Sequence, residues 1–152
     1  MKYMHIPSFF IIGISIKTSN ENQQAAQDIP ALWQRFMSEG LAAKIPNKIS
    51  EDLYCIYTDY EKDYTRPYTT VLGCKVSSLD QIPEGMTGYL IPEATYQLFT
   101  AKGKLADQIV FHKWSEIWNS GMERKYTADF EVYGAAAQNP EAAVVDIYLS
   151  IP

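Results

Sequence analysis

The sequence is poor in cysteine and histidine, with two residues of each type among 152. Cys55 and Cys74 are far from a C-x-x-C spacing and have no histidine beside them, so we expect no metal site. We interpret both as buried thiols of a reducing compartment, where a disulfide would form only if their strands placed them together. His5 and His112 have no serine, cysteine or carboxylate at a telling spacing, which argues against a catalytic triad. The sequence predicts no cofactor either.

Positive charge is also scarce, because 13 lysine and arginine residues stand against 18 acidic residues and leave a net charge of −5. Nucleic acid calls for a basic face, and the basic residues here are scattered, so we expect no direct nucleic-acid binding. No apolar run approaches the length of a membrane span, and residues 1–7 lack the features of a signal peptide. We therefore expect a cytoplasmic protein without a membrane partner.

Aromatic residues, in contrast, are abundant. They make up 13% of the chain, and eleven of them are tyrosines, which combine an apolar ring with a hydrogen-bonding hydroxyl. This favours a partly apolar binding surface, although half-buried strand positions would explain each tyrosine equally well. With 47% hydrophobic residues the chain can bury a core without disulfides or metals, and we expect one domain over residues 1–152.

The hydrophobic patterns predict the order strand, helix, strand, strand twice along the chain. In the first half these elements are residues 9–18, a helix capped by Asp28 and stopped by Gly40, 53–58 and 68–76. In the second half they are residues 94–100, a loop and helix over 103–119, 130–133 and 144–151. Two tandem βαββ repeats, about 1–78 and 89–152, predict an α+β fold with pseudo-twofold symmetry. We expect antiparallel sheets with the helices on one side and a ligand groove on the other.

A carboxylate and a phenol share one face of the strand 130–133. Side chains alternate along a strand, so Glu131 and Tyr133 point one way and Phe130 and Val132 the other. If that surface lines a pocket, Glu131 is positioned to hold a cation. The alternative is an ordinary solvated strand carboxylate.

Matching the repeats sets residues 54–57 against residues 130–133, so that Cys55 and Tyr57 take the places of Glu131 and Tyr133. The helices are expected to pack on the other, apolar faces, which carry Tyr54, Ile56, Phe130 and Val132. The carboxylate would then lie on the groove side, away from the helices.

Several short motifs resemble the GyrI-like effector-binding family in their order and spacing. They are Ile6–Gly13, Tyr54–Tyr60, Tyr68–Val76 with Gly73, Ile91–Tyr96, the helix with Trp114 and Trp118, Asp129–Tyr133 and Asp146–Pro152. That family includes effector domains of AraC-type and MerR-type regulators, gyrase-inhibitor-like proteins and stand-alone integron-cassette proteins. The resemblance spans essentially the whole chain. Where the family usually has glycine this chain has Cys55, which could narrow the groove.

The resemblance implies an aromatic pocket at the centre of the pseudo-twofold, with a glutamate that matches Glu131 and a lipophilic cation as its ligand. Aromatic faces attract a cation by about 0.5–2 kcal/mol each, and a carboxylate in a water-poor groove attracts it further. The candidate ligand-binding residues are Glu131, Tyr57, Tyr133, Tyr68, Tyr96, Trp114, Tyr148 and Cys55. For each of the tyrosines a structural place in a sheet is an equal alternative, and for Trp114 core packing is the better one.

Three functions compete at this point. The first is a non-catalytic binding module for hydrophobic, cationic compounds, acting in transcription regulation or in drug sensing and sequestration. The second is a gyrase-inhibitor-like module that interacts with a protein partner. The third is a hydrolase of cyclopropane-bearing or other electrophilic toxins, in which Glu131 activates water with help from Tyr133 or Tyr148. Because predicted strand residues begin by Phe9, no helix-turn-helix is expected before the domain, and the chain would act alone or through a partner.

Overall fold

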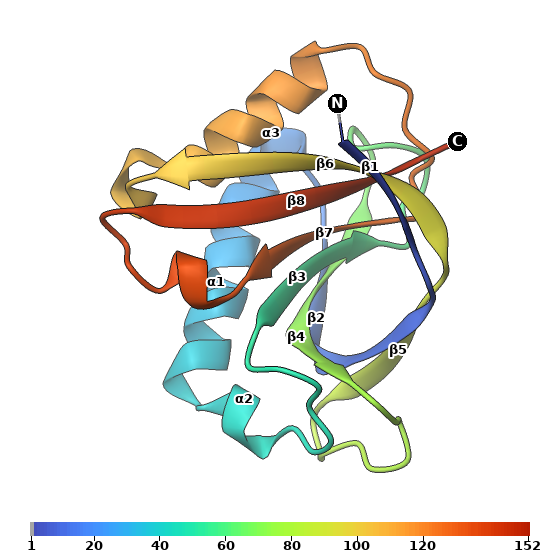
Figure 1. The fold of residues 1–152 in the computed structure, drawn as a ribbon, viewed down its shortest axis with the longest axis vertical. Helices are drawn as coiled ribbons and strands as arrows, with labels where there is room; N and C mark the ends of the chain where they lie inside the picture. Colours follow the sequence, from blue (N-terminus) through green and yellow to red (C-terminus); the bar gives the residue numbers. More distant parts are fainter. Residues whose placement is uncertain (1) are drawn as a thin grey trace.

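The computed structural model describes residues 2–152 and confirms the predicted α+β class, with eight antiparallel strands in one sheet and helices beside it (Figure 1). The strands are β1 (Lys2–Ile6), β2 (Phe9–Thr18), β3 (Leu53–Thr58), β4 (Tyr68–Val76), β5 (Thr87–Ile91), β6 (Ala94–Gly103), β7 (Ala128–Tyr133) and β8 (Ala143–Ile151). The α-helices are α1 (Gln24–Ser38), α2 (Leu41–Lys44) and α3 (Ile109–Asn119). None of the helices described is long and apolar enough to cross a membrane.

The sheet order is β1-β6-β8-β7-β3-β4-β2-β5, which reads symmetrically about the central pair of β7 and β3. In that pair Cys55 lies opposite Glu131. Two residues to one side of this pair Tyr57 lies opposite Asp129, and two residues to the other side Tyr133 lies opposite Leu53. A pseudo-twofold axis through the Cys55–Glu131 pair therefore relates the two βαββ units, β2-α1-β3-β4 and β6-α3-β7-β8. This register confirms the predicted match of residues 54–57 with residues 130–133.

Two edge strands that the sequence did not predict complete the sheet, and each pairs with the opposite half. β1 pairs with β6, and β5 pairs with β2. Only Pro92 and Glu93 separate the end of β5 at one edge from the start of β6 near the other edge. The sheet must curl to bring these ends together, and Figure 1 shows the strands bending around the interior of the molecule.

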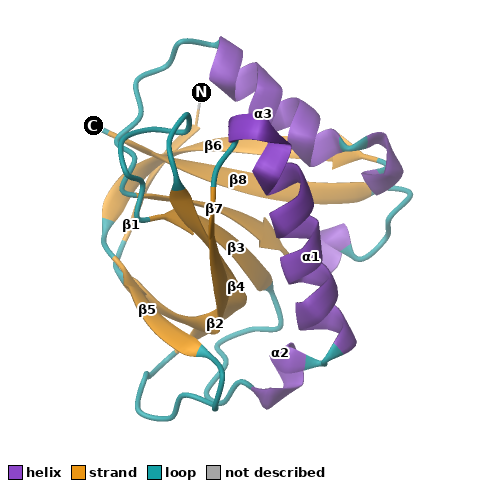
Figure 2. Cartoon of the chain, turned by 180° about the vertical axis from the view of Figure 1, so that it is seen from behind, coloured by secondary structure: helices purple, strands orange, loops and turns teal. Residues whose placement is uncertain are grey.

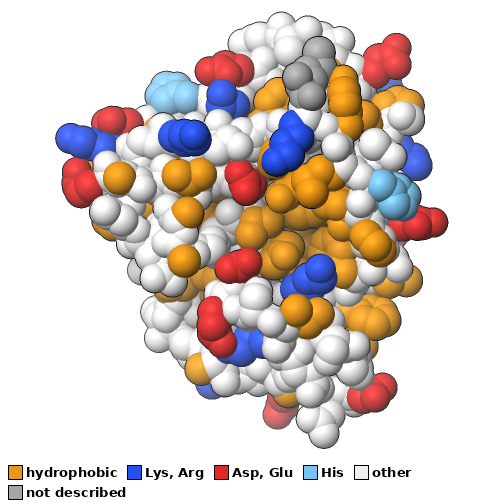
Figure 3. Space-filling view, in the orientation of Figure 1, with side chains coloured by type: hydrophobic (Ala, Val, Ile, Leu, Met, Phe, Trp, Pro, Cys, Tyr) orange, Lys and Arg blue, Asp and Glu red, His pale blue; other side chains and the backbone are white. Residues whose placement is uncertain are grey.

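The inner face of the curled sheet forms a core of its own. It contains Phe9, Ile11, Ile56, Val71, Ile91, Ala94, Tyr96, Ala128 and Phe130, all buried. Partly buried side chains, among them Tyr54 and Tyr148, pack against it, and Figure 3 shows hydrophobic side chains around a hollow on this side of the molecule. The chain buries these residues against one another without using a helix.

The helices cover the outer face, as Figure 2 shows from behind. α1 packs mainly on β2 and β4, and α3 packs mainly on β6. Leu32 and Phe36 of α1 lie in a core with Cys55, whereas Trp114 of α3 lies in another with Ile147. The expectation that the helices cover the face of Tyr54, Ile56, Phe130 and Val132 is therefore wrong, because those residues point into the curl and the helices lie on the Glu131 side.

The first helix also starts earlier than predicted. α1 begins at Gln24, so Asp28 is not its cap but lies inside it, where its carboxylate accepts a hydrogen bond from Thr18 Oγ1 at 2.8 Å. The predicted stop is confirmed, since α1 ends at Ser38 and Gly40 follows with a φ of 60°, in the left-handed region that glycine adopts readily.

Two glycines face each other across β2 and β4, where Gly13 pairs with Gly73. A Cβ atom on Gly13 would lie 2.7 Å from the Cα atom of Gly73 and would also overlap the Leu72 carbonyl. The neighbouring atoms are backbone, so they cannot move aside as a flexible side chain would. The pairing of these two strands therefore requires glycine at both positions.

We expect Gly13→Ala to lower the free energy of unfolding by about 1–3 kcal/mol, because overpacking forces the backbone to shift. Lys17→Ala serves as the control, since Lys17 is exposed on the same strand. Urea unfolding followed by circular dichroism measures both. Equal stability of the Gly13→Ala variant and the wild type would contradict the close approach of β2 and β4.

Candidate functional site

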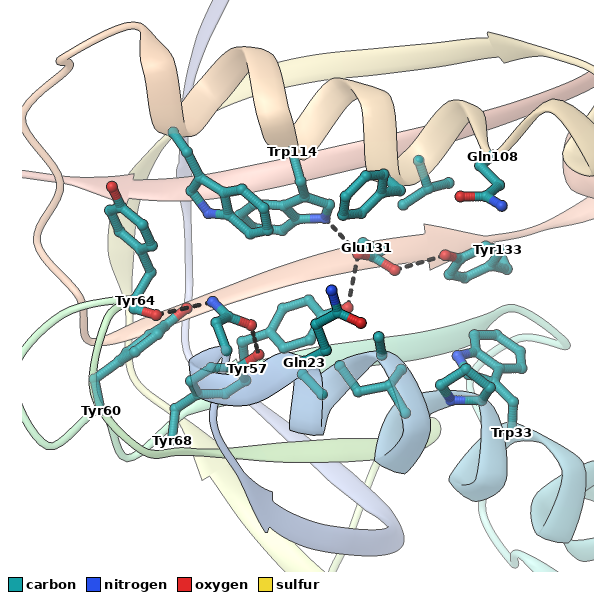
Figure 4. Close-up of a pocket in the computed structure, with 18 of the residues that line it drawn as sticks. Gln23, Trp33, Tyr57, Tyr60, Tyr64, Tyr68, Gln108, Trp114, Glu131 and Tyr133 are labelled. Carbon is teal, nitrogen blue, oxygen red and sulfur yellow. Dashed lines mark hydrogen bonds between the residues drawn. The ribbon is translucent and has the colours of Figure 1, made fainter.

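A cavity of about 790 Å³ lies between α1 and α3 on the outer face of the sheet. The helices pack on the outer strands of each half, so β3 and β7 lie between them and form the floor (Figure 4). The lining residues are mostly aromatic or aliphatic: Asn20, Gln23, Ala25, Ala26, Ile29, Pro30, Trp33, Tyr57, Tyr60, Tyr64, Tyr68, Gln108, Val110, Phe111, Trp114, Trp118, Arg124, Glu131 and Tyr133. The predicted groove thus exists, but on the side that carries the helices.

Glu131 lies on the floor of the cavity and is only 2% exposed. Its Oε2 atom accepts hydrogen bonds from the Tyr57 hydroxyl at 2.8 Å and from Trp114 Nε1 at 2.6 Å. Its Oε1 atom accepts a hydrogen bond from the Tyr133 hydroxyl at 2.6 Å, and all three bonds are drawn in Figure 4. The alternative of a solvated strand carboxylate is therefore wrong.

Burial raises the pKa of the Glu131 carboxyl, and the hydrogen bonds from Tyr133, Trp114 and Tyr57 act in the opposite direction. Burial also holds the pKa values of Tyr57, Tyr133 and Cys55 well above their ordinary values. These three groups stay neutral at physiological pH. Glu131 is the member of this cluster that can carry a negative charge.

Four aromatic rings surround the carboxylate in two matching pairs. Trp114 meets Tyr57 edge to face, with ring centroids 5.4 Å apart and planes at 84°. Trp33 meets Tyr133 in the same way, at 4.7 Å and 76°. Trp114 donates its indole N–H to Glu131, whereas the position equivalent to Glu131 in the first repeat is Cys55. The repeat thus supplies two equivalent aromatic pairs, but only one carboxylate.

A second polar network lies two residues earlier on β7. Asp129 is fully buried and forms an ion pair with Arg124, whose side chain is 3% exposed, at 2.6 Å. The Tyr60 hydroxyl donates to Asp129 Oδ2 at 2.6 Å, and the backbone N–H of Ser150 donates to Oδ1 at 2.8 Å. Burial opposes the charge of Arg124, but Asp129 and Tyr60 more than compensate and raise its pKa.

The structure brings together most of the candidate residues. Glu131, Tyr57, Tyr133, Tyr68 and Trp114 line the cavity. Cys55 is fully buried beneath it, with its Sγ 3.4 Å from the Tyr57 hydroxyl. Cys55 and Cys74 are both free thiols.

Tyr96 and Tyr148 do not line the cavity, and that expectation is corrected. Tyr148 lies opposite Phe130 and stacks on its ring at 4.8 Å, so it belongs to the inner face of the curl. Tyr96 is 1% exposed in the same inner core. Neither hydroxyl is on the side of the sheet to which Glu131 points, so Tyr148 cannot assist it.

Several lining residues were missed because the sequence placed them elsewhere. Helical spacing assigned Trp33 and Trp118 to a core, and Tyr64 fell in a charged turn. In the structure Tyr64 stacks on Trp118, with centroids 5.6 Å apart and planes at 12°. Trp33 could have been found, since each repeat carries a tryptophan on its helix and Trp114 was already a candidate.

Comparisons with known proteins agree with this architecture. The model of a protein family described as Cass2, integron-associated effector binding protein, matches residues 4–151. YobU of Bacillus subtilis (strain 168), named provisionally as a transcriptional regulator, is 29% identical over 143 residues, covering 91% of this chain and 89% of YobU. The transcriptional regulator BrlR of Pseudomonas aeruginosa is 28% identical over 154 residues, covering 95% of this chain but 53% of BrlR.

Solved structures share the fold. The integron cassette protein VCH_CASS2, from the mobile metagenome of Vibrio cholerae, superposes with a TM-score of 0.77 at 25% identity, covering 99% of this chain and 95% of that one. SAV2435, solved with tetraphenylphosphonium bound, superposes with a TM-score of 0.82 at 19% identity, covering 99% of this chain and 93% of its own. The resemblance read from the motifs is confirmed. Because the family model covers nearly every residue, the chain belongs to the Cass2 family of integron-associated effector binding proteins.

Proposed function

We propose that this chain is an effector-binding module for hydrophobic monocations, which it holds between α1 and α3 with Glu131 as the charge partner. The observation that carries the proposal is a carboxylate, 2% exposed, on the floor of a cavity lined by aromatic rings. Support comes from SAV2435, which has the same fold and was solved with the cation tetraphenylphosphonium. The names of YobU and BrlR, both given as transcriptional regulators, support a role in transcription regulation, and drug sensing or sequestration is the use that we propose for the same cavity.

The chemistry of the cavity selects for a diffuse cation. The aromatic faces of Trp33, Trp114, Tyr57 and Tyr133 attract positive charge, and the low local dielectric strengthens its attraction to Glu131. A small, strongly hydrated ion would lose its water shell and find only one carboxylate, already tied to three donors. A large lipophilic cation has little hydration to lose and buries apolar area on entering.

The register at the twofold limits the charge of the ligand. The place equivalent to Glu131 is held by Cys55, whose thiol stays neutral because burial raises its pKa. The second buried carboxylate, that of Asp129, is paired with Arg124. One uncompensated negative charge therefore faces the ligand, which favours a monocation over a dication.

The hydrolase alternative gains no support from the site. Both oxygens of Glu131 are engaged by donors, and Tyr148 lies on the other face of the sheet. A carboxylate held in this way is suited to stabilise a fixed charge. We therefore place binding ahead of catalysis.

Tetraphenylphosphonium should stabilise the wild type, because a ligand that binds only the folded state raises the melting temperature. At a concentration of 100 Kd the gain is about 2.7 kcal/mol, or about 5–10 °C for a chain of this size. We expect Glu131→Gln to remove most of this shift, since it keeps the shape of the side chain and loses the charge. Differential scanning fluorimetry measures the shift.

Glu116→Gln is the matched control, because Glu116 is an exposed carboxylate on α3 with 68% of its side chain accessible. Neutral triphenylmethane, which has no charge and no hydrogen-bond acceptor, is the ligand control and should shift both proteins far less than tetraphenylphosphonium does. The cation proposal fails if tetraphenylphosphonium leaves the wild type unchanged, or if Glu131→Gln responds as strongly as Glu116→Gln.

Cation binding should weaken as the pH falls, because only the ionised form of Glu131 attracts the ligand. Burial raises the pKa of this carboxyl above the ordinary value of about 4.3, so the loss begins at a higher pH than for an exposed glutamate. Below that pKa we expect the association constant to fall about tenfold for each pH unit. Calorimetric titration between pH 4 and pH 8 measures the slope, and binding that stays constant down to pH 4 would contradict the role of Glu131.

Without ligand, Glu131→Gln should be more stable than the wild type at pH 8, by about 1 kcal/mol or 2–4 °C. The folded pKa lies above the unfolded one, so ionising the buried carboxyl costs stability as the pH rises between the two values. Below the pKa of Glu131 in the unfolded chain the carboxyl is protonated in both states. The wild type and Glu131→Gln should then have the same melting temperature. Melting temperatures from pH 3.5 to pH 8.5 test this, and a variant less stable than the wild type at every pH would refute it.

A further inference from the structure

Arg124 brings a second polar group to the cavity, and part of it has no partner. Its side chain is 3% exposed, and Arg124 is among the residues that line the cavity. One guanidinium nitrogen, Nη2, donates to Asp129 at 2.6 Å and lies 3.5 Å from the Tyr60 hydroxyl. The other two, Nε and Nη1, are buried and have no hydrogen-bond partner among residues 2–152.

Aromatic rings hold this guanidinium in place. Its central carbon lies 4.4 Å from the centroid of the Tyr126 ring and 5.6 Å from that of Trp114. The rings and Asp129 keep bulk water from the two unpaired nitrogens. A buried donor without an acceptor costs about as much as a lost hydrogen bond, so such groups in proteins are generally satisfied by a partner.

The charge balance decides what kind of partner fits. Asp129 already compensates the positive charge of Arg124 in an ion pair that is fully shielded from water. A second carboxylate here would bring another anion close to Asp129 and Glu131 in a low dielectric, which is unfavourable. A neutral carbonyl, ether or hydroxyl oxygen accepts from both nitrogens without this penalty.

The Arg124–Asp129 pair lies close to Glu131, because Asp129 and Glu131 belong to the same strand, β7. Asp129 and Glu131 are two residues apart on the same face of the strand, which separates them by about 7 Å. Trp114 lies next to both, because it donates to Glu131 and borders the guanidinium of Arg124. One ligand of drug-like size can therefore reach both groups across a single indole ring.

We infer that the ligand carries a neutral hydrogen-bond acceptor on the side of its cationic centre that faces Arg124, and that Arg124 binds this acceptor through Nε and Nη1. The inference rests on the proposed function, since it assigns the second end of the same ligand. It makes Arg124 a specificity-determining residue that separates acceptor-bearing cations from purely hydrocarbon ones. Both nitrogens are covered in the structure, so the loop between α3 and β7, which carries Arg124 and Tyr126, must shift when the acceptor enters.

A matched pair of phosphonium ions tests this on the wild-type protein. The (4-acetylphenyl)triphenylphosphonium ion has a carbonyl oxygen at the required end, and (4-isopropylphenyl)triphenylphosphonium has the same shape without an acceptor. We expect the acetyl compound to bind about tenfold more tightly by isothermal titration calorimetry, as a hydrogen bond to a charged donor would give. Equal affinity of the two compounds would overturn the inference.

Arg124→Lys removes the guanidinium fork but keeps a positive charge for Asp129. We expect this variant to lose the preference for the acetyl compound over the isopropyl compound. Arg35→Lys is the control, because Arg35 is an exposed arginine on α1 with 51% of its side chain accessible, and it should keep the preference. A preference that survives in Arg124→Lys would also overturn the inference.

The outcomes separate this inference from the proposed function. If none of the phosphonium ions binds the wild type, the cation-binding function itself fails. If all of them bind and the acetyl group gives no advantage, only the role of Arg124 fails. A third probe, (4-carboxyphenyl)triphenylphosphonium, tests the charge of the acceptor, and tighter binding of this zwitterion than of the acetyl compound would refute a neutral one.

Discussion

A buried carboxylate at the junction of the two repeats is the constraint on which the rest of the structure depends. Glu131 lies on the pseudo-twofold axis, where taking a charge out of water is costly unless donors surround it. The donors come from both halves, since Tyr57 belongs to the first repeat while Trp114 and Tyr133 belong to the second. The site therefore forms only when both repeats have folded and paired through β3 and β7. Ligand binding and the docking of the two halves are aspects of one arrangement.

The cavity exists because the two faces of the sheet are buried in different ways. Because the sheet curls, its inner face buries itself, and both helices are free to cover the outer face. Each helix packs over the outer strands of its own half, and the central pair β3 and β7 is left between them. Large aromatic side chains, rather than another helix, line this gap. A fold built from two copies of one unit thus leaves its cavity where the copies meet.

The sequence was sufficient for six of the eight strands and for the symmetry, but not for the two edge strands or for the side of the sheet that faces the helices. Strands 53–58 and 68–76 follow from β-branched and aromatic content, and the repeat match placed Cys55 opposite Glu131 correctly. Alternation separates the two faces of a strand, yet here both faces are buried, so hydrophobicity cannot show which one meets a helix. The strand register favoured Tyr57 and Tyr133 as cavity residues, but it did not exclude Tyr148, which lies on the opposite face. Arg124 gave no signal, since it acts through a loop whose path depends on the buried Asp129.

The role that we propose for Glu131 depends on the pairing of Arg124 with Asp129. Two unpaired carboxylates about 7 Å apart on one strand face, in a cavity of low dielectric, would repel each other. Because Arg124 neutralises Asp129, Glu131 faces the cavity as its single uncompensated charge. The position equivalent to Asp129 in the first repeat is Leu53, and the position equivalent to Glu131 is Cys55, so the first repeat contributes no charge at either place. The symmetric positions supply the aromatic walls of the cavity. The positions of Glu131 and Asp129 have no acidic equivalent in the first repeat, so the charged groups of the cavity all come from the second repeat.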